Sequence, residues 1–502
     1  MYSNLRDRPK RYMRFMSAVI LSLLPMAPAA VADEGVCPAD LGSRIEAIAT
    51  RSAFDRARWG ILVQTLPPSP LDASTVVSPG QIETLYARDA RQFFIPASNV
   101  KLFTTAAALT RLHPQFRIRT SVYRESSASG ETVLRVVGRG DPTLTDADLD
   151  SLAQQIGDRS ITHITHLIGD DRYFQGSAIN PNWEWEDVQA GYGAPASSLI
   201  LNENEIRVTL TPQDLGEPLR VDWDDPAEAT RWQINNRSTT VAATEPEFVE
   251  VGRDFSQPIL NIRGQLRIGA RPDESAVSIP DPTDYFLQRL RQVLIAANIS
   301  VHQIAIAHSE RSDGQEIAAL HSPPLAELLG KANRDSNNLY AESLLRQMGA
   351  VAPAASSSSA LDDGIARAQA TLTQLGIDPS GYVMADGSGL SRHNLASPEA
   401  FVQTLQAMAR SPHAQMYRNS LAVAGVNGTL ANRFRDTAVA GNLYGKTGGL
   451  TGVSSLSGYL DPPNYVPLAF SILIDHSDKP GSVRRAAIDE IVLQMAQLQV
   501  CP

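Results

Sequence analysis

Residues 98–109 read SNVKLFTTAAAL, and this stretch decides the fold that the sequence predicts. Apolar side chains recur in it at helical spacing: Leu102, Phe103, Ala106 and Leu109. A buried helix should therefore begin close to Ser98. Residues three apart lie on one face of a helix, so the amine of Lys101 can reach the hydroxyl of Ser98. A desolvated neutral lysine can take the proton of a serine, which makes the two residues a candidate base and nucleophile.

Lysine is rare in this chain, which makes the position of each one informative. The 44 basic side chains include only five lysines: Lys10, Lys101, Lys331, Lys446 and Lys479. Arginine keeps its proton near neutral pH, whereas a lysine can lose it when its surroundings lower its pKa. An S-x-x-K motif is a weak signal by itself, but Ser98 to Lys101 is the only one in the sequence.

Two further short motifs follow. Ser336-Asn337-Asn338 lies in a helical region, where a bend would let Ser336 pass a proton and Asn338 hold a substrate amide. An ordinary polar turn is the alternative for these residues. Lys446-Thr447-Gly448 precedes Gly449 and a predicted strand at 453–460. A lysine and a hydroxyl suit a carboxylate ligand, and glycines let a substrate backbone approach; a hairpin turn is the alternative.

The three motifs stand in the order S-x-x-K, S-x-N, K-T-G, which is nearly the set of class A β-lactamases and penicillin-binding proteins. The long stretch between Ser98 and Ser336 does not fit a compact β-lactamase. The sequence resembles instead the class C low-molecular-mass penicillin-binding proteins, the D-alanyl-D-alanine carboxypeptidase/endopeptidase family. Four more segments carry the resemblance: GRGDPTL at 138–144, WEWED at 183–187, DGSGLSR at 386–392 and GVNGTLANR at 425–433.

The resemblance implies a serine-type D-Ala-D-Ala carboxypeptidase, a DD-endopeptidase, or both, acting on peptidoglycan stem peptides and inhibited covalently by β-lactams. It places catalytic roles on Ser98, Lys101, Ser336, Asn338 and Lys446, and substrate contacts on Thr447, Gly448 and Gly449. Two backbone N–H groups, of Ser98 and Gly449, are nominated for the oxyanion that acyl transfer creates. No metal or cofactor is implied.

The family's substrate carries a diaminopimelate side chain with its own ammonium and carboxylate. By resemblance, Asp187 would meet the ammonium, Tyr192 would pack on the aliphatic stem and Arg392 would bind the carboxylate. An acid, an aromatic ring and an arginine match such a zwitterion. The residues alone favour a blander alternative, an exposed loop acid at Asp187 and a structural ion pair at Arg392.

The predicted fold is α/β: a serine β-lactamase/transpeptidase-like domain with an antiparallel sheet flanked by helices. We expect residues 33–115 and 285–502 to form this catalytic domain. Short alternating segments separated by turn residues predict a large β-rich insertion at 116–284, as one or two added domains. Segments 453–460 and 466–474 are expected to pair as strands.

The N-terminus has the layout of an export signal. Residues 1–32 combine a basic head, an apolar run at 16–24 and a small-x-small site at Ala30-Val31-Ala32. They predict a signal peptide and a periplasmic protein, soluble or loosely membrane-associated, with no transmembrane anchor in its mature form. Export permits a disulfide between Cys37 and Cys501, although two free thiols are equally compatible with the sequence.

The net charge of −10 argues against a nucleic-acid partner. His163 and His166 lie three apart but no acidic or cysteine cluster accompanies them, so we expect surface histidines. Three alternatives to the peptidase remain: a β-lactam sensor, a wall-binding protein without turnover, and a β-lactamase. The sequence gives no oligomeric state and does not separate carboxypeptidase from endopeptidase activity.

Overall fold

The computed structural model describes residues 35–66, 82–126, 130–307, 314–351 and 359–501. The predicted signal peptide at 1–32 lies outside these residues. The chain divides into Met1–Gly35 and Val36–Pro502, and the architecture below is that of the second unit. No helix among the described residues combines the length and the apolar composition that crossing a bilayer requires.

A six-stranded antiparallel sheet lies at the centre of the part that carries Ser98. Its strands, in spatial order, are β16 (Ala422–Val423), β17 (Leu443–Leu450), β18 (Val453–Leu460), β19 (Leu468–Asp475), β1 (Arg58–Thr65) and β2 (Thr84–Arg88). The predicted pairing of 453–460 with 466–474 is confirmed as β18 with β19.

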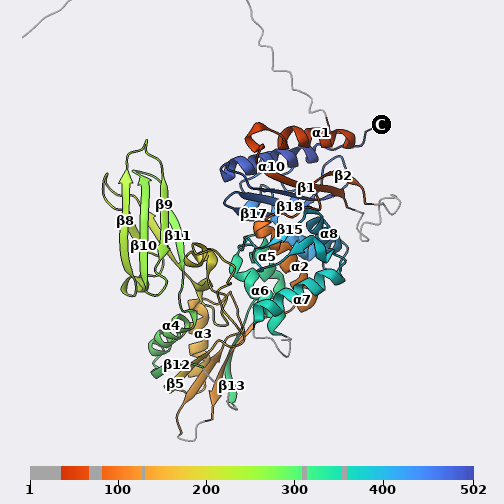
Figure 1. The fold of residues 1–502 in the computed structure, drawn as a ribbon. Coiled ribbons are helices and arrows are strands. Elements are labelled where there is room, and N and C mark those ends of the chain that lie inside the picture. Colours follow the sequence, from red (N-terminus) through yellow and green to blue (C-terminus); the bar gives the residue numbers. More distant parts are fainter. Residues whose placement is uncertain (1–34, 67–81, 127–129, 308–313, 352–358, 502) are drawn as a thin grey trace, which may run out of the picture. The chain divides into compact units, whose positions relative to one another are not determined.

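Both faces of this sheet are buried. Successive side chains of a strand point to opposite faces, so each strand contributes to two cores. In β1, Ile61 and Val63 belong to a core shared with α1 (Pro38–Ala49) and α10 (Gly481–Ala496), which lie side by side (Figure 1). Leu62, between them, belongs to the core on the other face. The predicted antiparallel sheet flanked by helices is confirmed.

The helices on the second face are α2 (Lys101–Leu112), α5 (Leu325–Asn333), α6 (Asn338–Ala350), α7 (Ala360–Gln374), α8 (Pro398–Ala409) and α9 (Ala414–Asn419). Phe103 of α2 stacks on Phe401 of α8 with ring centroids 4.5 Å apart. The helical region expected around Ser336 is broken at 334–337, where Ser336 has the left-handed φ of 62°. This break is the bend that the S-x-N motif requires.

The inserted region contains three further sheets. A mixed five-stranded sheet has the order β12 (Ser300–Ile306), β5 (His163–Asp170), β4 (Val133–Val137), β3 (Arg119–Glu125), β13 (Gly314–His321). One three-stranded sheet has the order β8 (Gln233–Val241), β10 (Ile259–Arg267), β9 (Phe248–Arg253), and the other β11 (Asp273–Ser278), β6 (Glu205–Thr211), β7 (Arg220–Trp223). Helices α3 (Asp146–Gly157) and α4 (Pro282–Ala296) accompany the mixed sheet (Figure 1).

The end of the insertion differs from the boundary expected at residue 285. The apolar face of α4, with Phe286 and Leu290, shares one core with Ile164 and Leu167 of β5. Strands β12 and β13 join the same five-stranded sheet. Residues 285–321 therefore pack with the inserted region, and the chain returns to the Ser98 core at α5. An amphipathic pattern such as that of α4 shows that a face is buried but not which sheet covers it.

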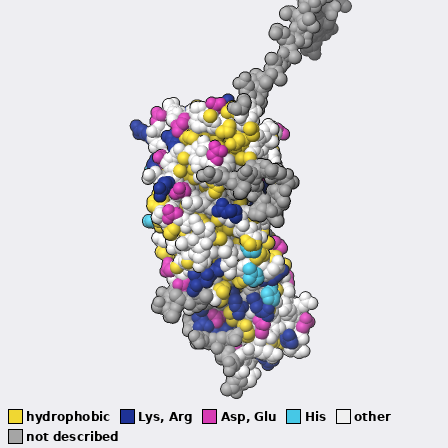
Figure 2. Space-filling view, turned by 90° about the vertical axis from the view of Figure 1, so that its right-hand side faces the viewer, with side chains coloured by type: hydrophobic (Ala, Val, Ile, Leu, Met, Phe, Trp, Pro, Cys, Tyr) yellow, Lys and Arg dark blue, Asp and Glu magenta, His cyan; other side chains and the backbone are white. Residues whose placement is uncertain are grey.

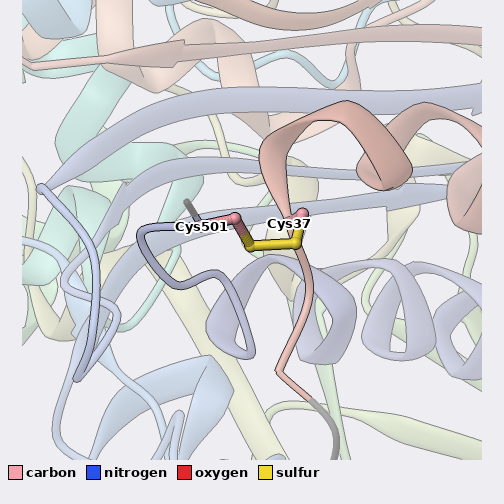
Figure 3. Close-up of a disulfide and its surroundings, with 2 residues drawn as sticks. All are labelled: Cys37 and Cys501. Carbon is pink, nitrogen blue, oxygen red and sulfur yellow. A yellow bond between two sulfur atoms is a disulfide. The ribbon is translucent and has the colours of Figure 1, made fainter.

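The two cysteines, for which the sequence left two states open, form a disulfide between Cys37 and Cys501 (Figure 3). Backbone pairing beside it also joins the two ends of the unit, since the N–H of Val36 donates to the carbonyl of Gln497 at 2.8 Å. The terminal helices α1 and α10 are thus fastened to each other covalently and by hydrogen bonds.

Arginine carries most of the surface ion pairs, as the composition suggested. Acidic and basic side chains are interspersed on the face shown in Figure 2. Of the four described lysines, Lys331 and Lys479 make surface pairs with Asp335 and Asp478. Lys101 and Lys446 are fully buried. Because burying a charged amine is costly, the two buried lysines need a specific environment.

Candidate active site

Ser98 lies in a single 3₁₀ turn, Ala97–Val100, that leads directly into α2, and Lys101 is the first residue of that helix. The Nζ atom of Lys101 lies 2.9 Å from Ser98 Oγ. It also donates to Asn338 Oδ1 at 2.7 Å and to the carbonyl of Ser388 at 2.6 Å. Burial lowers the pKa of Lys101 to about 7, against the opposing effect of the nearby Asp386 and Glu342 carboxylates.

The loop that supplies the Ser388 carbonyl packs tightly under Ser98. Gly389 has φ 81°, and a Cβ there would lie 1.9 Å from the carbonyl oxygen of Ala97. Buried Asp386 holds the loop, since it accepts hydrogen bonds from the N–H groups of Gly389 and Ser391, both at 2.7 Å. These contacts hold the conformation of the DGSGLSR segment, which the sequence singled out only through the family resemblance.

The bend between α5 and α6 brings the S-x-N residues to the same place. Asn337 caps α6 by accepting the N–H of Tyr340 at 3.1 Å. Asn338 contacts Lys101 through Oδ1, and its Nδ2 donates to the carbonyl of Tyr192 at 2.9 Å. One amide side chain therefore connects the Ser98 helix with the inserted region.

Strand β17 carries the third motif, Lys446-Thr447-Gly448. The Nζ of Lys446 donates to Ser336 Oγ and to the carbonyl of Thr447, both at 2.7 Å. Burial, together with the positive charge of Lys101, holds the pKa of Lys446 well below its usual value. Gly448 sits where a Cβ would lie 2.2 Å from Ser455 Oγ, so only glycine fits there, whereas the space beside Gly449 is open.

Ser98 of the first motif and Ser336 and Asn338 of the second border one cleft of about 860 Å³, whereas Thr447 and Gly448 are not among its lining residues. The lining is made of Ser98, Glu184, Glu186, Asp187, Tyr192, Ser336, Asn338, Gly389, Leu390, Arg392, Gly449, Leu450 and Thr451. Lys101 and Lys446 lie buried behind it, in hydrogen-bond contact with Ser98 and Ser336. The sequence-predicted residues of all three motifs thus meet in space.

The three residues proposed for the diaminopimelate side chain also line this cleft. Burial raises the pKa of Asp187, and burial and Asp187 together raise the pKa of Tyr192 to about 12. Arg392 pairs with Glu184, Nε to Oε1 at 3.1 Å, and donates to the carbonyl of Thr451 at 3.1 Å. Arg392 therefore makes the ion pair foreseen as its alternative role while still facing the cleft.

Three features of the site were not found from the sequence. The carbonyl of Ser388 is a backbone group and leaves no residue signal. Glu342 is fully buried and accepts hydrogen bonds from the N–H groups of Gly387 and Ser388 at 2.8 and 3.0 Å. The sequence signal that could have singled out Glu342 was Arg346, which lies four residues later on the same helix face and pairs with it. Glu184 belongs to the WEWED segment but was not singled out.

Within the described residues, no group of three or more histidine, cysteine, aspartate or glutamate side chains could hold a metal ion.

Comparison with known proteins identifies the family of the chain. Residues 44–495 match the model of the D-Ala-D-Ala carboxypeptidase 3 (S13) family. A D-alanyl-D-alanine carboxypeptidase of Actinomadura sp. (strain R39) is 32% identical, with 96% of this chain and 90% of that protein covered. The DacB carboxypeptidase of Haemophilus influenzae is 25% identical over 82% of this chain and 86% of its own.

Among solved structures, penicillin binding protein 4 (dacB) from Haemophilus influenzae superposes with a TM-score of 0.75 at 22% identity. The superposition covers 90% of this chain and 98% of that one, which shows that the two share a fold. The family match and the relative that is 32% identical confirm the family that the motifs suggested. The chain belongs to the D-Ala-D-Ala carboxypeptidase 3 (S13) family of serine peptidases.

Proposed function

We propose that this chain cleaves the bond after a D-alanine in peptidoglycan stem peptides, as a carboxypeptidase or endopeptidase, through an acyl-enzyme on Ser98. The observation that carries the proposal is the contact of 2.9 Å between Ser98 Oγ and a buried lysine whose pKa is about 7. A base with a pKa near the working pH is well matched to proton transfer.

The contacts of Lys101 suit it to act as that base. A neutral amine has two N–H groups and one lone pair. Asn338 Oδ1 and the Ser388 carbonyl accept from the amine at 2.7 and 2.6 Å. With both N–H groups so used, the lone pair faces the hydroxyl of Ser98. Lys101 then takes the hydroxyl proton as Ser98 Oγ attacks the carbonyl carbon of the penultimate D-alanine.

The second lysine and its serine serve the leaving group and the terminal carboxylate. An anion close to Lys446 favours its charged form, so a bound carboxylate would raise the pKa of this desolvated amine, which would then take up a proton from water and pair with the carboxylate. Thr447 adds a hydroxyl to the same contact. Ser336 Oγ, 2.7 Å from Lys446 Nζ, can relay a proton to the amine that leaves when the peptide bond breaks. Water then hydrolyses the acyl-serine ester.

The remaining residues hold the substrate. The backbone N–H groups of Ser98 and Gly449 stabilise the oxyanion, and Asn338 orients the peptide. Asp187, Tyr192 and Arg392 recognise the side chain that precedes the D-alanine. The ammonium, aliphatic stem and carboxylate of a diaminopimelate match these three groups, which line the same cleft as Ser98.

The same chemistry makes β-lactams covalent inhibitors of Ser98. The basic and apolar layout of residues 1–32 supports export to the periplasm, where such peptides are found.

Release of D-alanine from a pentapeptide substrate tests the proposal. Lys101→Ala should lower the turnover rate by about 10²–10⁴-fold, the usual contribution of a general base. Lys479→Ala is the matched control, because this surface lysine pairs only with Asp478 and should leave the rate unchanged. A folded Lys101→Ala protein with the normal rate would rule out the base role.

A further inference from the structure

A second groove adjoins the active-site cleft. It has a volume of about 770 Å³ and shares Glu186 and Tyr192 with the cleft. Its floor is the outer face of the sheet β8–β10–β9, and Glu274, Ser275 and Ala276 of β11 line it as well. The two hollows therefore border the same segment, which contains Glu186 and Tyr192.

Contacts between separate segments of the chain hold the border of the groove in place. The loop at its border is tied to the sheets, because the carbonyl of Val188 accepts hydrogen bonds from Ser278 Oγ at 2.6 Å and Arg253 at 3.2 Å. Trp185 packs against Phe255 with ring centroids 3.8 Å apart and the ring planes tilted by 36°. A hollow held by contacts between two parts of the chain is a better ligand site than one bounded by an untethered loop.

The floor of the groove carries polar side chains beside the apolar Val249 and Val251. Along β10, Leu260 and Ile262 point into the core, whereas Asn261 and Arg263 point outward, as the two-residue period of a strand requires. Asn235 of β8 donates to Asn261 Oδ1 at 3.0 Å. The groove thus offers side-chain amides, which bind peptide groups, acetamido groups and hydroxyls alike.

One cation of the floor has no acidic partner. Arg263 pairs with Glu250 on the neighbouring strand. Arg237, in contrast, makes no ion pair among the residues that the structure describes, and its Nε donates only to Asn235 Oδ1 at 3.3 Å. In a chain with net charge −10, an exposed unpaired guanidinium inside a groove is a candidate site for a carboxylate.

The direction of the bound substrate follows from β17, if the proposed function holds. The terminal carboxylate lies at Lys446 and Thr447, and the residue before the D-alanine lies toward Arg392, which binds the carbonyl of Thr451. The part of the substrate further upstream then leaves the cleft past Tyr192 and Glu186. An extended peptide advances about 3.3–3.6 Å per residue, so each residue upstream of the D-alanine brings the chain closer to the groove.

We propose that this groove binds the upstream part of the substrate, namely the carboxylate-bearing start of the stem peptide and the N-acetylated sugar to which it is attached. Arg237 pairs with the upstream carboxylate, and Asn235 and Asn261 bind its amide and acetamido groups. This inference rests on the proposed function, and it names the part of peptidoglycan that the insertion recognises.

Calorimetric titration with a disaccharide-tripeptide tests the groove without catalysis, because this probe has no D-alanine to release. Arg237→Glu should weaken its binding about tenfold or more, since a favourable charge contact becomes a repulsive one. Arg220→Glu makes the same charge change on β7, outside the groove lining, and should bind as the wild type does.

A kinetic comparison completes the test. With a disaccharide-pentapeptide, Arg237→Glu should raise KM about tenfold at unchanged kcat, while a short acyl-D-Ala-D-Ala substrate and benzylpenicillin react at wild-type rates. Equal losses on the long and short substrates, or unchanged binding of the tripeptide probe, would overturn the proposal. If the wild type turned over neither substrate, the proposed function would fail, and the calorimetric result would still decide the groove.

Discussion

Glu342 and Lys101 are connected through the backbone of Ser388. The carboxylate of Glu342 accepts the N–H of Ser388 at 3.0 Å, and the carbonyl of the same residue accepts a hydrogen bond from Lys101 Nζ at 2.6 Å. The charge of Glu342 also acts on Lys101, because it favours the protonated amine. Glu342 is thus linked to the lysine through Ser388, although it does not line the cleft.

The first prediction concerns the buried ion pair of Glu342 with Arg346, in which Glu342 Oε2 and Arg346 Nη1 lie 2.7 Å apart. Glu342→Gln leaves a buried guanidinium without its charge partner, which should reduce the free energy of unfolding by about 3–5 kcal/mol. Urea denaturation measures this loss. Glu490→Gln is the control, because its pair with Arg51 is exposed and should contribute about 1 kcal/mol or less. Equal losses in the two variants would contradict the stabilising role of the buried Glu342–Arg346 ion pair.

The second prediction is a pH profile. Lys101 acts as a base only when neutral, so the acylation rate should fall about tenfold per pH unit below its pKa. With a pKa of about 7, the rate should rise through neutrality and level off above it. Stopped-flow acylation with benzylpenicillin between pH 5 and 9 gives the midpoint. A rate that stays constant over this range would exclude Lys101 as the titrating base.

The third prediction concerns the Cys37–Cys501 disulfide, which closes a loop of 464 residues. A cross-link over so long a loop restricts the unfolded chain, so the double variant Cys37→Ser/Cys501→Ser should lose about 2–5 kcal/mol of stability. The disulfide joins the two ends of the unit at α1 and α10 and has no contact with the cleft lining. Acylation of the folded variant should therefore be unchanged, and a slower rate would show that the terminal helices influence the site.

The fourth prediction concerns the side chain next to the scissile bond. Arg392→Ala should lower kcat/KM roughly tenfold for peptides with diaminopimelate, because a charge-assisted contact to its carboxylate is lost. Peptides with lysine at that position lack the carboxylate and should be affected far less. Arg410→Ala, an exposed arginine outside the cleft lining, is the control. Equal effects on both peptides would mean that Arg392 serves only its ion pair with Glu184.

The sequence predicted the local part of the site well. Ser98 and Lys101 are three residues apart, in a 3₁₀ turn and at the first position of the helix that follows it, so local geometry brings them together. The bend at Ser336 was expected from the motif. The contact of Lys446 with Ser336, across 110 residues, follows from no local rule and needed the resemblance or the structure.

The parts that the sequence did not predict share a physical cause. The Ser388 carbonyl is a backbone group, and any residue would supply it. Helix α4 has a clear apolar face, but the pattern does not say that Ile164 and Leu167 of β5 cover it, so the insertion boundary was placed too early. The position of the groove beside the cleft depends on how the loop around Tyr192 folds back, which is a tertiary property.

The most direct test of the central claim is the intact mass of the protein after incubation with benzylpenicillin, for wild type and Ser98→Ala. We expect one penicillin adduct on the wild type that persists for minutes, and none on the variant. An adduct on Ser98→Ala would place the nucleophile elsewhere, and no adduct on the wild type with the drug intact would contradict acylation of Ser98 altogether. Destruction of the drug without an adduct would indicate a β-lactamase instead.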